Sequence, residues 1–250
     1  MFRKTIANSG SGAAGAGVEA ALGAALTAAM DWAGGKKLSF KETLGMMKEF
    51  FGAYIKYHAE LQRQDNWIKK YAAQKGFKVN PHWMFFTNLK IWIIESEKAF
   101  GKRYCPCFEP SDLEELNSKL ICPCKFAEKE IEEHGTCHCV LFGSGDLAED
   151  SFKQAEQHLM QEYRVPLKFK DGVLDTRGMV RDKLRDLPIP DSLHQVKRVL
   201  GMGRPLKVIM ETEAEARNLE KFAQFRKLSC RREDGDGSFS VVFTDDVSFK

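Results

Sequence analysis

The stretch "RYCPCFEPSDLEELNSKLICPCKFAEKEIEEHGTCHCVL", residues 103–141, repeats one motif three times and decides the kind of fold. Six of the seven cysteines of the chain fall within 35 residues of this stretch, as three Cys-x-Cys pairs. The pairs are Cys105 with Cys107, Cys122 with Cys124, and Cys137 with Cys139, and only Cys230 lies elsewhere. In a reducing cytosol, such a concentration of cysteine indicates metal or redox chemistry more often than structural disulfides.

The spacing within each pair favours separate tasks for its two sulfurs. Two cysteines at positions i and i+2 of an extended chain have Cα atoms up to about 7 Å apart, near or beyond the reach of an unstrained disulfide. Pro106 and Pro123 each fix one backbone angle and remove one N–H, which stiffens the loop. Both thiols of such a pair can then point at something outside the loop.

Six thiols are more than a single familiar metal site uses. A structural zinc ion takes four ligands, usually in Cys pairs with wider spacing, so Cys-x-Cys fits zinc poorly. A [4Fe–4S] cluster also takes four thiolates, which leaves two thiols, enough for one redox-active disulfide. The count favours a cluster beside a dithiol but does not assign the individual cysteines. A structural metal site with two spare thiols is the alternative.

Composition sets limits on the class of protein. The 250 residues are 43% hydrophobic, which suits one large globular domain or two small ones. The net charge is only +3, with both signs interleaved, which argues against a nucleic-acid partner. The sequence lacks a run of about 18 uncharged apolar residues, which argues against a membrane partner. "ANSGSGAAGAG" stands where a signal peptide needs an apolar core, so we expect a cytoplasmic protein.

Helical periodicity dominates the first two thirds of the chain. Residues 1–40 form a Gly- and Ala-rich N-terminal extension. The apolar spacing after it predicts helices over residues 39–62, 64–75, 82–100, 111–120, 127–134 and 146–164. Gly76 and Gly101 are natural C-caps. The cysteines therefore fall in loops and at helix ends, and "GSGD" at residues 143–146 is interpreted as one more loop.

The last third alternates between strand-like and helical patterns. "VPLKFKDG", residues 165–172, reads as a boundary. Strands are then predicted over 172–178 and 205–212, helices over 191–203 and 213–227, and a hairpin around the "DGDG" turn over 228–246. The order β-α-β-α-β-β predicts a small two-layer α/β sandwich with both helices on one face. The fold class of the whole chain is then α+β.

The three motifs resemble the signature of the catalytic (beta) subunit of ferredoxin:thioredoxin reductase. They read Cys-Pro-Cys, Cys-Pro-Cys and Cys-His-Cys, and "KGFKVNP", "FGKRYCPC" and "HGTCHCVLF" agree as well, over roughly residues 46–145. The spacers of 14 and 12 residues differ somewhat from those of the best-known chloroplast enzymes. Val140 stands where those enzymes usually have Gly. Their small second subunit has no counterpart in this chain.

The resemblance implies a role for each cysteine of the motifs. Cys107 and Cys139 become the redox-active pair, with Cys107 as the attacker of the partner disulfide. His138, between two of the cysteines, can donate a proton to a leaving thiolate. The ligands of the [4Fe–4S] cluster become Cys105, Cys122, Cys124 and Cys137.

The activity implied by the resemblance is that of an iron–sulfur disulfide reductase. Ferredoxin donates electrons one at a time whereas a disulfide takes two, and a cluster beside the dithiol bridges this difference. The acceptor would be a thioredoxin-like protein. Two alternatives are a reductase of persulfides or small disulfides in sulfur metabolism, and a non-enzymatic iron–sulfur redox sensor.

The C-terminal third resembles the small sulfur-carrier proteins of the TusA type over about residues 167–246. "LDTRGMV" and the later "LPIPDSLHQVKRVL" carry this likeness. Leu187 stands where that family has its sulfur-bearing cysteine, so this position cannot carry sulfur. Cys230 lies in a predicted strand and is expected to be a packed residue. We expect a docking or regulatory module, which in the sulfur-metabolism alternative would bind a sulfur carrier.

Together these patterns predict three parts. Residues 1–40 are the extension, residues 41–163 a ferredoxin:thioredoxin reductase-like [4Fe–4S] domain, and residues 167–250 a TusA-like domain.

Overall fold

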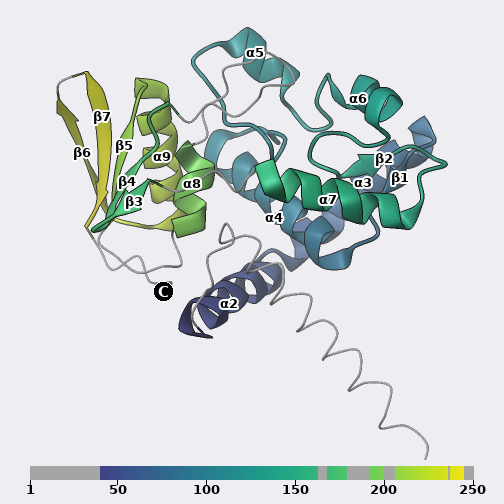
Figure 1. The fold of residues 1–250 in the computed structure, drawn as a ribbon, viewed down its shortest axis with the longest axis horizontal. Coiled ribbons are helices and arrows are strands. Elements are labelled where there is room, and N and C mark those ends of the chain that lie inside the picture. Colours follow the sequence, from purple (N-terminus) through teal and green to yellow (C-terminus); the bar gives the residue numbers. More distant parts are fainter. Residues whose placement is uncertain (1–39, 163–167, 179–191, 200–205, 236, 245–250) are drawn as a thin grey trace, which may run out of the picture.

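The computed structural model describes residues 40–162, 168–178, 192–199, 206–235 and 237–244. Within these ranges the chain is a mixed α+β protein, as predicted, with a helical unit followed by a sheet unit (Figure 1). The predicted N-terminal extension lies almost entirely outside the described residues, and so does Leu187.

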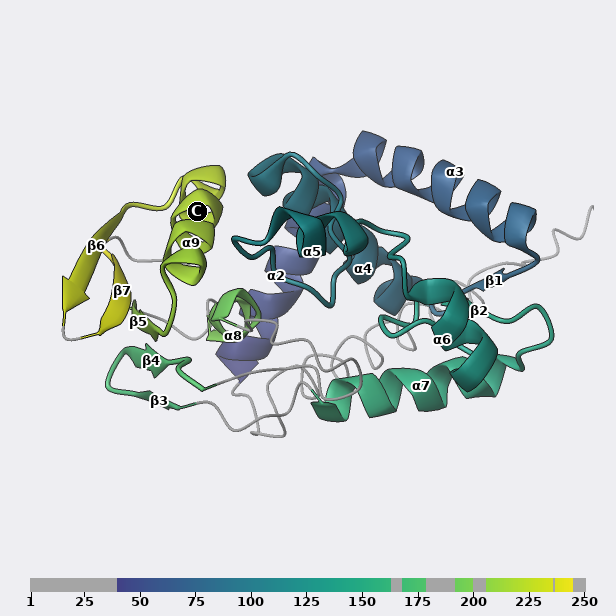
Figure 2. The same ribbon diagram turned by 90° about the horizontal axis from the view of Figure 1, so that it is seen from above.

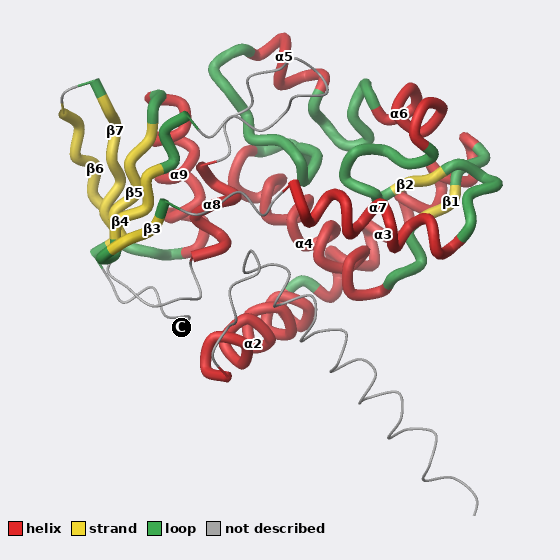
Figure 3. The backbone as a smooth tube through the Cα atoms, in the orientation of Figure 1, coloured by secondary structure: helices red, strands yellow, loops and turns green. Residues whose placement is uncertain are grey.

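The helical unit carries all three cysteine pairs. Its elements are α2 (Phe40–Lys56), α3 (His58–Lys75), β1 (Lys78–Val79), α4 (Trp83–Phe100), α5 (Glu114–Lys119), α6 (Ala127–His134), β2 (Phe142–Gly143) and α7 (Glu149–Glu162). From α4 to α7 the chain runs mostly as loops and turns, interrupted by α5 and α6 (Figure 3). Gly76 and Gly101 end their helices in the left-handed conformation, with φ of 69° and 75°, which confirms the predicted C-caps.

The helix predicted over residues 39–62 is divided in the structure. The break falls at Tyr57, between α2 and α3, where the side chain is buried at 2% exposure. Tyr57 belongs to one apolar cluster with Leu61 and with Ile91 and Ile94 of α4. Periodicity could not reveal this break, because both helices are amphipathic and the turn is stabilised by packing against a distant helix.

A two-stranded antiparallel sheet joins the segment that follows α3 to the segment that follows the third cysteine pair. Lys78 pairs with Gly143 and Val79 with Phe142. Gly143 is therefore part of strand β2, which corrects the prediction that residues 143–146 form only a loop. Position 143 also leaves no room for a side chain, since an added Cβ at Gly143 would lie 2.6 Å from the buried ring of Phe152.

Gly145 is predicted to be intolerant of any side chain. An added Cβ would lie 2.5 Å from the backbone carbonyl oxygen of Gly76, which cannot rotate away. We expect Gly145→Ala to lower the free energy of unfolding by about 1–3 kcal/mol, the usual cost of overpacking. The matched control is Gly52→Ala within α2, which has nothing within 4 Å of the added atom and should stabilise the helix by about 0.8–1 kcal/mol. Urea unfolding of both variants checks the pair, and equal effects would contradict the packing argument.

The sheet unit has the predicted order of elements with one strand added in front. Its elements are β3 (Phe169–Lys170), β4 (Val173–Asp175), α8 (Ser192–Val199), β5 (Leu206–Met210), α9 (Glu213–Arg226), β6 (Cys230–Gly235) and β7 (Ser238–Phe243). The strands lie in the order β3-β4-β5-β7-β6, with β4 and β5 parallel and the other pairs antiparallel. The short β3, in the stretch interpreted as a boundary, was not predicted because a two-residue strand shows no periodicity.

Both helices of the sheet unit cover one face of the sheet, as predicted. Figures 1 and 2 show α8 and α9 between the sheet and the helical unit. Alternate residues of β5, namely Leu206, Val208 and Met210, are buried beneath them. Cys230 in edge strand β6 packs against the same core, which confirms its predicted structural role.

Helix α9 also contacts the helical unit, through α4. The guanidinium of Arg226, near its C-terminal end, lies 2.9 Å from Glu95 of α4 and 3.1 Å from Glu49 of α2. Among the helices that the structure describes, none combines the length and the apolar character that a membrane crossing requires.

Candidate metal centre and redox site

Short backbone pairings bring the three cysteine loops together. An isolated bridge between Tyr104 and Ile121 sets the first loop beside the second, and the Cys105 amide donates to the Leu120 carbonyl oxygen at 2.8 Å. The Cys137 amide donates to the Phe142 carbonyl oxygen at 3.0 Å, which folds the third loop back onto β2. The loops that sequence patterns placed between helices therefore meet at one point of the helical unit.

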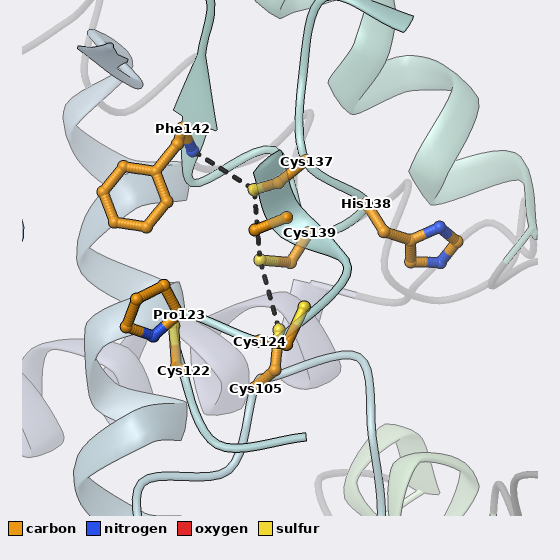
Figure 4. Close-up of a pocket in the computed structure, with 9 residues that line it drawn as sticks. Cys105, Cys122, Pro123, Cys124, Cys137, His138, Cys139 and Phe142 are labelled. Carbon is orange, nitrogen blue, oxygen red and sulfur yellow. Dashed lines mark hydrogen bonds between the residues drawn. The ribbon is translucent and has the colours of Figure 1, made fainter. Parts of the chain in front are cut away.

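All six sulfurs converge in a single buried cluster. Every cysteine of the three pairs is at most 8% exposed, and none of the seven cysteines of the chain forms a disulfide. The Sγ atom of Cys139 lies 3.5 Å from that of Cys105 and 3.8 Å from that of Cys137 (Figure 4). The sulfurs of Cys105, Cys107 and Cys139 all lie within 4.8 Å of one another.

Five of the six cysteines line one cavity, together with Pro123, His138 and Phe142 (Figure 4). The five include all four ligands predicted from the resemblance: Cys105, Cys122, Cys124 and Cys137. Cys139, predicted as the redox partner held against the cluster, is the fifth. Cys107, the predicted attacker, is absent from the lining. The division of the six cysteines into ligands and redox pair stays a prediction.

The chemistry of this donor set fits a thiolate-held metal group. Hydrogen bonding with Cys105 and Cys107 raises the pKa of the Cys139 thiol well above its ordinary value. A hydrogen bond with Cys105, together with burial, does the same for the pKa of Cys124. Thiols crowded in this way lose their protons when a cation lies among them, and thiolates are the ligands that iron–sulfur groups use.

A network of hydrogen bonds contacts the third cysteine loop at Val140. The Asn80 side-chain amide donates to the Val140 carbonyl oxygen at 2.9 Å and to a Glu156 carboxylate oxygen at 2.7 Å. The same carboxylate oxygen lies 2.7 Å from Nδ1 of His82. The sequence patterns assigned no role to Asn80 or to His82. The word "VNP" in the motif resemblance was the only signal that pointed to Asn80.

Val140 has a φ of 57°, in the left-handed region that favours glycine. This conformation suits the Gly that the chloroplast enzymes usually have at this position. The buried side chain of Val140 packs with Phe152 and Leu159 of α7, so the strained backbone is offset by apolar contacts. The turn falls directly after Cys139, and the Val140 amide donates to the Cys137 carbonyl oxygen at 2.8 Å.

His138 is fixed by its backbone rather than aimed at the sulfurs. Its amide donates to a Glu130 carboxylate oxygen at 2.9 Å. Figure 4 shows the imidazole ring extending away from the column of sulfur atoms. A role of His138 in proton donation would require rotation of this side chain, and it stays a prediction.

Glu109 is a buried carboxylate two residues after Cys107 that sequence reasoning did not single out. It is 1% exposed, and it accepts hydrogen bonds from the Ser192 hydroxyl at 3.1 Å and from the Leu193 amide at 3.1 Å. Burial raises the pKa of Glu109 to about 8, and the nearby carboxylate of Glu215 acts in the same direction, while the hydrogen bonds oppose them. Both donors come from the beginning of α8, more than 80 residues along the chain.

Glu109 should make the stability of the folded protein depend on pH. Folding raises the pKa of Glu109 from an ordinary value of 4.5 to about 8, so between these two pH values the folded state binds more protons than the unfolded state. This contribution is fully present below the unfolded pKa and is lost as the pH rises to about 8, at up to about 1.4 kcal/mol per pH unit. We expect the free energy of unfolding of the wild type, relative to that of Glu109→Gln, to fall as the pH is raised from about 5 to about 8. Urea unfolding of both proteins measures this difference. A difference that does not change with pH contradicts the prediction.

Buried thiols that converge on a helical scaffold, without disulfides among them, are able to hold a metal group and to supply redox-active sulfurs. The sequence model of the ferredoxin thioredoxin reductase catalytic beta chain family matches residues 40–165, half of the chain, including all three pairs. The chain belongs to this family. No curated protein matches it.

Membership of the family settles the class of activity. The family consists of disulfide-reducing oxidoreductases associated with iron–sulfur groups, so the chain is an enzyme, as predicted, and the non-enzymatic sensor is excluded. The match ends at residue 165, before the sheet unit. The TusA-like resemblance of that unit and the predicted domain boundaries stay predictions, and nothing in the match supports a sulfur carrier as partner.

Proposed function

We propose that this enzyme reduces the disulfide of a thioredoxin-like protein with single electrons from ferredoxin. The observation that supports the proposal best is the convergence of six buried thiols, of which five line one cavity and the sixth lies beside it. This arrangement provides enough ligands for a metal group and still leaves a dithiol. The family match supplies the expected donor and acceptor.

The cavity would hold a [4Fe–4S] cluster on the four cysteines that the resemblance assigns as ligands. They are Cys105, Cys122, Cys124 and Cys137. When bound, the cluster would supply one-electron transfer, which thiol–disulfide chemistry alone does not provide. The remaining chemistry belongs to the protein's own thiols.

The dithiol of Cys107 and Cys139 would carry out the exchange. The Cys107 thiolate attacks one sulfur of the substrate disulfide, forms a mixed disulfide and expels the other sulfur, which takes up a proton. The Cys139 thiolate, within 4.8 Å of Cys107 in the structure, then attacks the Cys107 sulfur and releases the second substrate thiol. The substrate has gained two electrons and two protons. Two electrons from ferredoxin, delivered singly, and two protons restore the dithiol.

His138 would serve as the proton donor to the leaving thiolate after rotation of its side chain, since it directly precedes Cys139 and lines the cavity. The reaction requires reduced thiols between turnovers. We therefore place it in a reducing compartment, the cytoplasm.

The proposal is tested on the full chain purified without oxygen. We expect a brown protein with about four iron and four sulfide per chain, as the cluster type requires. With reduced ferredoxin, it should reduce a thioredoxin disulfide faster than it reduces small disulfides. A colourless protein that contains only zinc would contradict the cluster, and an iron–sulfur protein without thioredoxin activity would contradict the acceptor.

A further inference from the structure

Cys107 lies too deep to meet a protein disulfide in the conformation described. It is 4% exposed and the next residue, Phe108, is 5% exposed. A thiol that attacks a disulfide must reach the substrate sulfur to bonding distance, with the three sulfurs nearly in line. The loop that carries Cys107 must therefore move during turnover. The contacts that keep this loop in its buried position then control access to the thiol.

Residues of the sheet unit form hydrogen bonds with this loop. Both oxygens of the Glu109 carboxylate accept from the Ser192 hydroxyl, at 3.1 Å and 3.2 Å, and one accepts from the Leu193 amide. The Asn218 side-chain amide of α9 lies 3.4 Å from Glu109 and donates to the Pro110 carbonyl oxygen at 2.5 Å. Two consecutive residues of the loop are thus bound by two helices of the other unit.

The attachment is polar and local. Beside it lies a cleft of about 240 Å³ between the two units, lined by Pro110 and Asp112 on one side and by Arg217 and Lys221 of α9 on the other. The ion pair of Asp112 with Arg217 crosses the cleft at the surface, where such pairs contribute little. The buried side chain of Glu109 is then the main attachment, because it takes part in several hydrogen bonds that are shielded from water.

The distance from the tie to the thiol is short. Only Phe108 separates Glu109 from Cys107, and Pro106 stiffens the chain on the other side. Two residues of chain span at most about 7 Å, so a displacement of Glu109 is transmitted to the sulfur rather than absorbed.

We propose that Glu109 is a positioning residue through which the sheet unit holds Cys107 in its buried position, and that release of this contact exposes the thiol to substrate. The inference rests on the proposed function, in which Cys107 is the attacking thiol. It gives the sheet unit a function that needs no sulfur-bearing cysteine. A substrate protein or other partner that displaces α8 and α9 would activate the thiol.

The test measures access to the Cys107 thiol directly. Full-length, fully reduced protein is treated with iodoacetamide without oxygen, and the alkylation rate of each cysteine is read by peptide mass spectrometry. Cys230, in edge strand β6, serves as the internal reference. We expect Glu109→Ala to speed alkylation of Cys107 by about tenfold or more, because it deletes several buried hydrogen bonds at once and leaves their donors without an acceptor. Glu109→Gln, which keeps an acceptor for the Leu193 amide, should stay within about threefold of wild type.

The contact between Glu109 and Ser192 is also tested by a change at Ser192, because removal of the buried Glu109 side chain can disturb the fold. Ser192→Ala deletes one hydroxyl in the sheet unit and should speed Cys107 alkylation by about threefold or more. Asp112→Asn, which removes only an exposed ion pair, should leave the rate unchanged. Iron content is measured in every variant.

Two results would overturn the inference. One is an unchanged Cys107 alkylation rate in Glu109→Ala protein that retains its iron. The other, decisive if that variant loses iron, is an unchanged rate in Ser192→Ala protein. Neither depends on turnover. Failure of the proposed function would appear separately, as full disulfide reductase activity in a Cys107→Ser variant.

Discussion

Cys107→Ser will abolish disulfide reduction and leave the iron in place. Serine cannot form the mixed disulfide, so we expect turnover with reduced ferredoxin to fall at least about a thousandfold. The iron should stay because Cys107 does not line the cavity that the other five cysteines of the motifs share. Iron and sulfide analysis beside a thioredoxin reduction assay measures both effects on one preparation.

The matched control is Cys124→Ser, which alters a predicted ligand and should lose most of the iron together with the activity. Cys230→Ser, in the sheet unit, should change neither. The structure also offers a competing assignment, since Cys105, Cys107 and Cys139 bring their sulfurs close enough to hold one metal ion. Loss of iron from the Cys107→Ser protein would favour that assignment over ours.

Arg226→Leu is expected to produce the largest loss of stability. Arg226 places its guanidinium between Glu49 of α2 and Glu95 of α4, and Glu95 is only 3% exposed. Removing the cation brings two carboxylates together in a poorly hydrated place without the charge that offsets their repulsion. Breaking a buried ion pair in this way costs about 3–5 kcal/mol. Urea unfolding at neutral pH measures the loss.

Two controls identify the cause of that loss. Arg217→Leu removes a guanidinium from the same helix whose ion pair with Asp112 is exposed, and it should cost less than about 1 kcal/mol. The double variant Arg226→Leu with Glu95→Leu should recover at least half of the loss, because apolar residues replace buried ion pairs well. A loss in Arg226→Leu as small as that in Arg217→Leu would show that the Arg226 pairs contribute no more than exposed ones.

The sequence alone determined the features that depend on near neighbours in the chain. The helices α3 and α4 and their glycine caps at Gly76 and Gly101 follow from apolar spacing and from the conformational freedom of glycine. The order of the sheet unit follows from strand and helix patterns of ordinary length. The three Cys-x-Cys motifs indicated the class of chemistry, because thiols at that spacing are of little use to each other as disulfides.

The tertiary structure decided what depends on residues far apart in the chain. Convergence of the three loops rests on bridges such as Tyr104 with Ile121, and the break at Tyr57 rests on packing against α4. The tie between Glu109 and Ser192 joins residues 83 positions apart, so no local pattern could reveal it. Periodicity reports which face of an element is apolar, whereas the neighbour that covers that face, and the buried polar partner within it, are selected only when distant segments pack together.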